Sequence, residues 1–262
     1  MASQAPNTLP LLYDGLEPLN RNAHGNYKVR KVGGIARVAS AHAIPVTVDE
    51  FSLAQRHYPI VFSSGDNPVP LALMGLHEGT NTFFNADGTL IEPNVYVPAY
   101  LRRYPFMLAR LRDDSDELSL CFDPTADAVG DFADGEPLFD GDEPTEATKA
   151  ILQFCEQFEQ AGQRTQAFMA ELKTAGLLME GEVAIQPEGA EQPAIYRGFQ
   201  MVDEEKFQAL RGDELRKLNQ NGALSLIMAH LFSLAVVREI FARQVQQGTG
   251  PANIRLPATA EA

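Results

Sequence analysis

The segment GALSLIMAHLFSLAVV, residues 222–237, constrains the fold more than any other part of this sequence. It is apolar on nearly every side of the helix that its composition favours, and such a helix is stable only when protein or lipid covers it. Its 16 residues would span about 24 Å as a helix, less than the ~30 Å hydrocarbon core of a bilayer. It also contains His230 and Ser233 and is followed by Arg238 and Glu239. We therefore expect a core helix that folds inward against β-structure, with no membrane insertion.

The first half of the chain offers that β-structure as short apolar segments between turn signals. PIVFSSG, residues 59–65, and PLALMGL, residues 70–76, predict two strands with a turn between them. Residues 106–112 and 118–122 predict a second pair. The connections are short, which favours antiparallel pairing. Thr47 and Glu50 match a capping box, which predicts a short helix after residue 50.

From residue 144 on, helical patterns dominate. Apolar residues recur at helical spacing in residues 147–161, Gly176 suits a helix C-cap, and Asp213 begins a long final helix that we expect to bend near Asn221. Two further short strands fall at residues 181–185 and 196–202. The fold class predicted is α+β, with a strand-rich, mainly antiparallel N-terminal half packed with a helical C-terminal half. The predicted boundaries within one domain of residues 1–262 are 1–125 for the strand-rich half, 126–143 for an acidic linking loop, 144–247 for the mainly helical half and 248–262 for a mobile tail.

The charge of the chain narrows the class of partner. There are 35 acidic and 21 basic residues, a net charge of −14, and nucleic-acid binding requires basic side chains that displace counterions from the phosphates. We expect no nucleic-acid partner. Residues 113–148 hold 13 Asp or Glu and no Lys or Arg, but they lack the ligand order of an EF-hand. A solvated acidic loop is favoured over a calcium site there.

Several familiar chemistries have no motif in this sequence. There is no Walker loop, no GxGxxG after a strand and no GxSxG elbow. The five histidines do not show metal-ligand spacing. Cys121 and Cys155 both lie in apolar runs, as free buried thiols of a reducing cytoplasm do. We predict no metal, no cofactor and a cytoplasmic protein, we assign no catalytic residue, and we favour a protein that is not an enzyme.

The segment YVPAYLRRYPFMLARL, residues 96–111, is the best candidate for a binding site. Arginine presents a planar fork of donors that matches a carboxylate, and tyrosine rings can stack on it. Two interpretations stay open: the arginines pair with the acidic loop of the chain itself, or they recognise an anionic ligand such as a peptide carboxylate. His230 is either a hydrogen-bonded core histidine or a polar group in a pocket of the helical half. The candidate ligand-binding residues are Tyr96, Tyr100, Arg102, Arg103, Tyr104 and His230.

The sequence of this segment also resembles part of a known protein family. YVPAYLRRYPF resembles the most distinctive stretch of the bacterial SapC family, and further blocks match in order from about residue 10 to residue 240: NTFFNADGTL, GEPLFDGDEPTE, FMAELKTAGLL, YRGFQMVDEEKFQAL and LIMAHLFSL. The chain departs from many relatives in having no tryptophan, where one is expected after the NADG turn. This is the family with a surface-layer-linked name, distinct from the peptide-transporter permease that shares the name.

The resemblance implies a cytoplasmic accessory protein, because relatives tend to be encoded near TonB-dependent receptors and halogenase-like proteins. It implies a protein partner in an envelope-associated pathway of uptake or surface modification, and it brings no catalytic residues. The alternative function is an enzyme that modifies a small molecule or peptide in such a pathway. Homo-oligomerisation through the C-terminal helix is a further expectation, because that helix is apolar almost all round.

Overall fold

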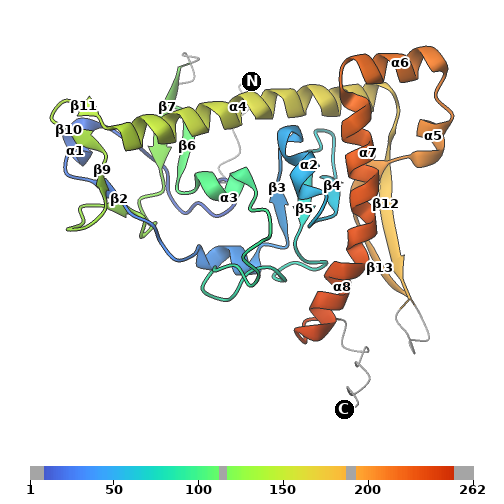
Figure 1. Ribbon diagram of the computed structural model, residues 1–262, viewed down its shortest axis with the longest axis horizontal. Helices are drawn as coiled ribbons and strands as arrows, with labels where there is room; N and C mark the ends of the chain where they lie inside the picture. The colour runs from blue at the N-terminus through green and yellow to red at the C-terminus, as the bar shows by residue number, and fades with distance from the viewer. Residues whose placement is uncertain (1–8, 112–116, 187–192, 251–262) are drawn as a thin grey trace, which may run out of the picture. The chain divides into compact units, whose positions relative to one another are not determined.

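The structure is a computed structural model that describes residues 9–111, 117–186 and 193–250. The predicted turn after residue 112, the turn around residue 188 and most of the predicted mobile tail lie outside the described residues. The α+β fold class is confirmed, with antiparallel sheets and a helical C-terminal region (Figure 1). The chain divides into two compact units that interleave in sequence: unit 1 comprises residues 1–35 and 100–160, and unit 2 comprises residues 36–99 and 161–262.

Unit 1 is built from short strands around one apolar cluster. Strands β6 and β7 pair antiparallel along their full lengths, as predicted, and β1 extends this sheet on the other edge of β7. The cluster packs Phe106, Phe122 and Leu138 against Cys155 of the long helix α4. The elements of unit 1 are β1 (Glu17–Pro18), α1 (Arg21–His24), β2 (Lys28–Val29), α3 (Ala99–Arg103), β6 (Phe106–Arg110), β7 (Leu118–Phe122), β8 (Val129–Gly130), β9 (Glu136–Pro137), β10 (Phe139–Asp140), β11 (Glu143–Pro144) and the first half of α4 (Glu146–Thr174).

The acidic segment is part of this unit's structure and does more than link two halves. Strands β8 and β9 flank β2 in a three-stranded sheet, and β10 pairs with β11. Apolar residues spaced among the carboxylates explain the difference from the loop that we expected, because Ala128, Val129 and Leu138 are buried. The carboxylates between them stay at the surface, so the segment is solvated on one side and packed on the other.

Unit 2 contains a five-stranded antiparallel sheet in the order β12-β13-β4-β5-β3. The pair β4 and β5 forms as predicted, and the two strands predicted near residues 181 and 196 form the longer hairpin of β12 and β13. The elements of unit 2 are η1 (Ala36–Ser40), β3 (Ala43–Pro45), η2 (Val48–Glu50), α2 (Phe51–Ala54), β4 (Ile60–Ser63), β5 (Pro70–Leu73), the second half of α4, β12 (Leu178–Ile185), β13 (Ala194–Val202), α5 (Glu204–Gln208), α6 (Gly212–Gln220), α7 (Ala223–Ser233), η3 (Leu234–Val236) and α8 (Val237–Gln246).

The apolar helix α7 packs on strands β13 and β4 of this sheet, so the prediction that it folds against β-structure is confirmed (Figure 1). The predicted long final helix is interrupted at Gly222, whose φ of 82° is open to glycine and strained for other residues. By length and composition alone, Ala223–Gln246 is the one stretch among the described residues that could cross a membrane. Ile227, His230 and Ser233 on the side of α7 that faces the sheet are buried, while Phe232 on its other side is 65% exposed.

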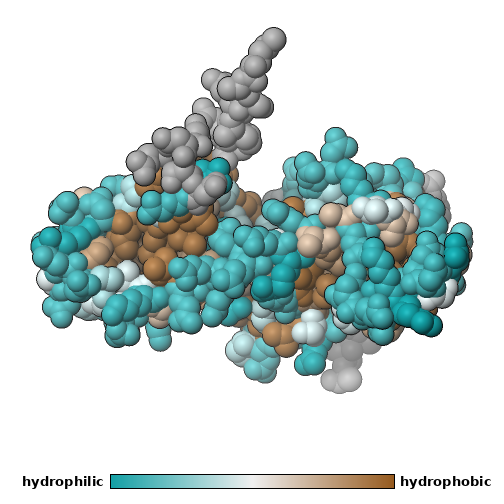
Figure 2. Space-filling view, turned by 90° about the horizontal axis from the view of Figure 1, so that it is seen from above, coloured by the Kyte–Doolittle hydropathy of each residue, from teal (hydrophilic) through white to brown (hydrophobic). Residues whose placement is uncertain are grey.

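Hydrophilic residues cover most of the face shown in Figure 2, and hydrophobic residues reach the surface between them in patches.

Candidate functional site

The segment of residues 96–106 is divided between the two units, with Tyr96 in unit 2 and Tyr100 onward in unit 1. Tyr96 is held by hydrogen bonds within unit 2. Its hydroxyl donates to Glu50 Oε1 over 2.9 Å, and its carbonyl accepts from the Tyr58 hydroxyl over 2.6 Å. The Ala99 N–H also donates to Glu50 Oε1 over 2.6 Å. Tyr96 therefore anchors its own segment onto the helix start at Glu50.

Glu50 is a buried carboxylate with a second role beyond the capping box. The capping box is confirmed, because Glu50 Oε2 accepts hydrogen bonds of 2.9 Å from the N–H and the hydroxyl of Thr47. Its other oxygen receives the donors of Tyr96 and Ala99. The four donors compensate the cost of removing this charge from water.

In unit 1, α3 is a short helix that ends at Arg103, just before Pro105, because a proline disfavours helical backbone at the residue that precedes it. The tyrosines on either side of the arginines make long-range contacts within the unit. The Tyr100 hydroxyl donates to the carbonyl of Leu11 over 2.7 Å, and the Tyr104 hydroxyl donates to Asp123 Oδ2 over 3.2 Å. Burial raises the pKa of Tyr100, and Arg103 lowers it to a smaller extent. The Tyr100 phenol therefore stays protonated at neutral pH, and both hydroxyls act as hydrogen-bond donors.

Arg103 is the most unusual side chain of the unit because its side chain is only 5% exposed. Its guanidinium lies over the rings of Tyr100 and Phe158, 4.8 Å and 4.3 Å from their centroids. Its ion pair with Glu159 is a loose one, with 3.6 Å between Nη1 and Oε1. Nε has no hydrogen-bond partner among the described residues. A buried N–H without an acceptor is uncommon in a native protein.

Glu159, the partner of Arg103, belongs to helix α4 and not to the acidic loop. Burial raises the pKa of the Glu159 carboxyl, and Arg103 offsets this only in part. The cations that meet the acidic segment come instead from the N-terminal part of unit 1. Arg21 pairs with Asp142, and Arg30 pairs with Asp134 over 3.8 Å. The Arg30 guanidinium also lies over the ring of Phe132, 3.8 Å from its centroid.

A cavity of about 560 Å³ lies beside these arginines in unit 1. Four of its lining residues are cationic, and no carboxylate occurs among the described residues that line it. Arg102 lines it from α3, with its guanidinium 5.3 Å from the ring centroid of Phe154 on α4. The lining residues are Val29, Arg30, Lys31, Val32, Arg102, Arg103, Tyr104, Pro105, Phe106, Ala128, Ala150, Ile151, Phe154 and Cys155. In a chain of net charge −14, this concentration of positive charge favours an anion.

The cavity offers little for acid–base or nucleophilic chemistry. Burial raises the pKa of the Cys155 thiol to about 11, so the group is a thiol and not a nucleophilic thiolate at neutral pH. Burial likewise raises the pKa of Cys121, which lies on β7. No histidine is found among the lining residues described. The arrangement is suited to holding a ligand in place.

Asp123 is a structural residue of this site that sequence reasoning missed. The side chain is fully buried, and its Oδ2 accepts from the Asp14 N–H over 3.0 Å as well as from Tyr104. Its Oδ1 accepts from the N–H and the hydroxyl of Thr125, over 2.9 and 2.7 Å. It thus ties the N-terminal segment and Tyr104 to the end of β7. The Asp-x-Thr spacing is a known signal for such a local turn, but the acidic surroundings suggested a solvated residue.

His230, the remaining candidate, lies in the core of unit 2 with no exposed surface. Its Nε2 accepts from the Val202 N–H over 3.0 Å, and its Nδ1 lies 2.7 Å from the Ile60 carbonyl. The ring stacks on Phe62 with 4.6 Å between centroids. Burial lowers the pKa of His230 to about 4, so the ring is neutral with its proton on Nδ1. Both ring nitrogens are satisfied by the backbone, as in the interpretation of a core histidine.

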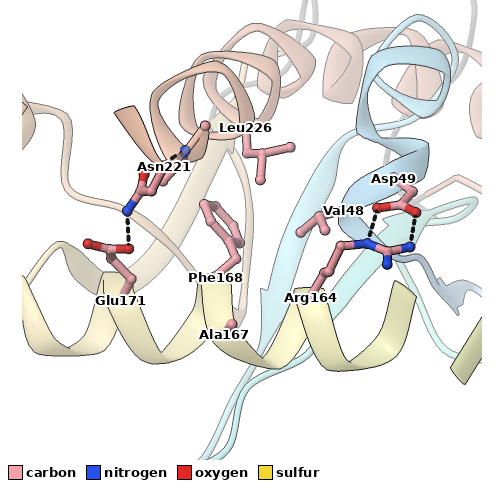
Figure 3. Close-up of a pocket in the computed structure, with 10 residues that line it drawn as sticks. Val48, Asp49, Arg164, Ala167, Phe168, Glu171, Asn221 and Leu226 are labelled. Carbon is pink, nitrogen blue, oxygen red and sulfur yellow. Dashed lines mark hydrogen bonds and ion pairs between the residues drawn. The ribbon is translucent and has the colours of Figure 1, made fainter. Parts of the chain in front are cut away.

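Unit 2 has a groove of its own, of about 390 Å³, between η2, α4 and the start of α7 (Figure 3). Phe168, Val48 and Leu226 form its apolar floor. At each end of the groove, the charged side chains that line it are held by hydrogen bonds to neighbouring side chains. Arg164 donates two hydrogen bonds to Asp49, of 3.1 and 2.5 Å, and Glu171 accepts from Asn221 and from Lys217.

No group of three His, Cys, Asp or Glu side chains within the described ranges is arranged to hold a metal ion.

The comparisons with known proteins give one match. A family model described as SapC matches residues 19–240, which is most of the chain. Neither the search of curated proteins nor the search of solved structures found a match. The matched range includes the divided tyrosine–arginine segment, the cavity of unit 1 and the core helix α7, and by this match the chain belongs to the SapC family.

Proposed function

We propose that this protein is a non-enzymatic accessory protein whose unit 1 binds a small anionic ligand in the cavity lined by Arg102 and Arg103. The observation that carries the proposal is the group of four cationic residues, Arg30, Lys31, Arg102 and Arg103, that lines the cavity without a carboxylate among the described lining residues. An anion in the cavity would be attracted by this group of positive charges.

The charges around the cavity support an anion over a cation or a neutral ligand. Arg30, Lys31 and Arg102 line the cavity with Arg103, while the carboxylates that compensate Arg30 and Arg103 do not line it. Low dielectric walls strengthen the attraction of such a group of cations for a negative charge. The volume of about 560 Å³ falls in the range of small-molecule sites, about 300–1,000 Å³.

The biological setting that we propose follows the family. We infer that the protein acts in the cytoplasm, with a protein partner in an envelope-associated pathway of uptake or surface modification. Membership of the SapC family and the net charge of −14 support this setting. The alternative is an enzyme of the same pathway that modifies a small molecule or peptide; Cys155, whose pKa burial raises to about 11, would not be its nucleophile at neutral pH.

The test uses native mass spectrometry of the full chain after incubation with a small-molecule extract of bacterial cytosol. We expect an anionic species to remain bound to the wild type and to be lost from the Lys31→Gln/Arg102→Gln double variant. Both side chains are exposed, so the variant should fold normally. The matched control is Arg164→Gln/Lys206→Gln, which removes two exposed cations of unit 2 and should keep the ligand. Equal retention by both double variants would overturn the proposal.

A further inference from the structure

We propose that the anion bound in the unit 1 cavity is a dissolved amphiphile, with one charged head group at the entrance of the cavity and an apolar body against its walls. Lys31 and Arg102 hold the head group, and the body lies against Val32, Ile151 and Phe154. This inference rests on the proposed function and names the class of its ligand. It follows from which lining residues a ligand can reach and from the chemistry of those residues.

The cations that a ligand can reach lie at the entrance of the cavity. Lys31 and Arg102 both line it, and both are exposed. The Lys31 side chain makes no hydrogen bond or ion pair with any residue that the structure describes. Arg103 lies deeper, because its side chain is 5% exposed and its charge faces Glu159. It adds positive potential, while the direct contacts to a head group fall to the ammonium and the guanidinium at the entrance.

The walls beside these cations are apolar and within reach of a ligand. Val32 is 39% exposed, and Ile151 and Phe154 of α4 are half-buried. Ile151 also packs on the core cluster of unit 1, which holds it in place. The Arg102 guanidinium lies 5.3 Å from the ring centroid of Phe154, so a reachable cation and an apolar wall lie side by side. Sites with mostly apolar walls and a few placed polar groups suit ligands that combine both characters.

The cavity has little to offer a polar body such as a peptide. Apart from the four cations, the polar side chains among the described lining residues are those of Tyr104 and Cys155. The Tyr104 hydroxyl already donates to Asp123, and Cys155 is only 1% exposed. The backbone of β2, which contributes Val29 to the wall, is paired on both sides by β8 and β9. A peptide would bury backbone N–H and C=O groups with few partners, whereas an alkyl or aryl body has no such groups to satisfy.

The head group is defined by its charge and not by its shape. An ammonium is a compact point charge, and a guanidinium binds carboxylates and phosphates alike. The same head groups also occur on lipids in a bilayer. The chain has a net charge of −14, and an anionic bilayer surface repels a protein with such an excess of negative charge. A molecule dissolved in the surrounding water is therefore the source that the charge of the protein favours.

Isothermal titration calorimetry of the full chain separates the head group from the body with four probes: octanoate, butanoate, octyl phosphate and octanol. We expect octanoate to bind, butanoate to bind at least about tenfold more weakly because four methylenes are missing, and octanol to bind at least about tenfold more weakly because it carries no charge. Binding of octyl phosphate in place of octanoate would support the inference equally. Equal binding of the long-chain and short-chain anions would overturn the amphiphile and leave the proposed anion site intact. Absence of binding by every anion, or octanol binding as tight as that of octanoate, would overturn both.

Matched variants assign the head group and the body to their residues. Phe154→Ala removes part of the apolar wall, so we expect at least about fivefold weaker octanoate binding and less than about twofold weaker butanoate binding. Lys31→Gln removes charge and no apolar wall, so both anions should weaken by the same factor. Phe139→Ala changes a half-buried aromatic residue of unit 1 that is not among the lining residues, and it should bind octanoate as the wild type does. Equal weakening of both anions in Phe154→Ala would overturn the placement of the body.

A second variant keeps this placement testable if Phe154→Ala does not fold. Val32 is exposed, so Val32→Ser should keep the circular dichroism spectrum and melting temperature of the wild type. We expect it to weaken octanoate binding more than butanoate binding, because it replaces apolar surface by a hydroxyl. If the folded Val32→Ser variant binds both anions as the wild type does, the body does not lie against this wall and the inference fails.

Sedimentation with lipid vesicles distinguishes the two sources of the head group. The vesicles are equimolar phosphatidylcholine and phosphatidylglycerol, which present an anionic bilayer surface. We expect the protein to stay in the supernatant, in the same buffer in which it binds octanoate. Sedimentation of the wild type, but not of Lys31→Gln/Arg102→Gln, would overturn the assignment to a dissolved amphiphile and leave the proposed function intact.

Discussion

The cavity of unit 1 and the groove of unit 2 have similarly apolar walls, yet their charged groups differ in one respect. In the groove, Arg164 donates hydrogen bonds from two nitrogens to Asp49, and Glu171 accepts from Asn221 and pairs with Lys217 (Figure 3). The cavity, in contrast, is lined by four cationic residues, Arg30, Lys31, Arg102 and Arg103, and by no carboxylate among the described residues. The polar groups of the groove are satisfied within their own unit, whereas the cations of the cavity attract an anion.

The same contrast separates the polar residues buried in the two units. His230, Glu50 and Asp123 have all their hydrogen bonds within their own unit, so each contributes to the stability of that unit. Arg103 is also buried, but its Nε has no partner among the described residues and the residue lines the cavity of unit 1. This contrast makes two predictions. Replacing a buried residue that is fully hydrogen-bonded should lower the unfolding free energy. Removing an unsatisfied polar atom that lies outside a cavity should not lower it.

The largest expected effect is that of His230→Ala. The change removes a stacked ring and leaves the Val202 N–H and the Ile60 carbonyl without partners in the core of unit 2. A new cavity and two unsatisfied backbone groups cost about 3–5 kcal/mol of unfolding free energy. Urea denaturation followed by circular dichroism would measure it. His77→Ala, at an exposed histidine, is the control and should change little; a loss below 1 kcal/mol at His230 would contradict its structural role.

The pH dependence of stability tests the same residue without changing the core. Burial lowers the pKa of His230 to about 4 from an ordinary value of 6.5, so the unfolded chain binds this proton at a higher pH than the folded chain does. The contribution of the neutral ring is complete above pH 6.5 and is lost as the pH falls towards 4, by about 3 kcal/mol in total. We expect urea midpoints to fall across this window in the wild type. The slope should be shallower in His230→Asn, and an unchanged slope would show that other groups govern the acid sensitivity.

The parts of the fold that follow from local signals were predictable from the sequence. The pair of β4 and β5 depends on two apolar runs and a turn between them, and Gly176 ends α4 with a φ of 66°. Asp203 caps α5 through a 3.0 Å bond from the Lys206 N–H. Each signal lies within a few residues of its effect, so no knowledge of tertiary contacts is needed to read it.

The candidate site was only partly predictable because its decisive contacts are distant in sequence. The aromatic and cationic character of residues 96–106 was visible in the sequence, and so was the potential of tyrosine to stack on arginine, as Tyr100 and Arg103 do. The division of the segment between two units was not visible, nor was Glu159 as the partner of Arg103, 56 residues away. Asp123 looked like one solvated carboxylate among many, because the donors that bury it come from Asp14 and Tyr104.

A smaller effect, of opposite sign, is expected at Tyr196. Its hydroxyl is buried in unit 2 beside Ile185 and Phe241 and has no partner among the described residues. Removing an unsatisfied polar group restores an apolar contact, so Tyr196→Phe should leave stability unchanged or raise it by up to about 1 kcal/mol. The matched control is Tyr58→Phe, which deletes the 2.6 Å bond to the Tyr96 carbonyl and should lower stability by about 1–2 kcal/mol. Thermal unfolding of the pair measures both, and a destabilised Tyr196→Phe would mean that its hydroxyl has a partner after all.

The smallest effect on folding is expected at Phe232. A variant there tests whether an exposed apolar side chain contributes to the stability of the fold or to contacts with a second copy of the chain. Phe232 is 65% exposed on the outward side of α7, opposite the side that packs on the sheet. Phe232→Ser should change the unfolding free energy by no more than about 0.5 kcal/mol, because surface changes rarely do more. Light scattering across a range of concentrations would then report on partners. If this face joins two copies, the wild type will show a larger mass than the variant at high concentration, and an equal monomer mass for both would leave the C-terminal helix without a role in self-association.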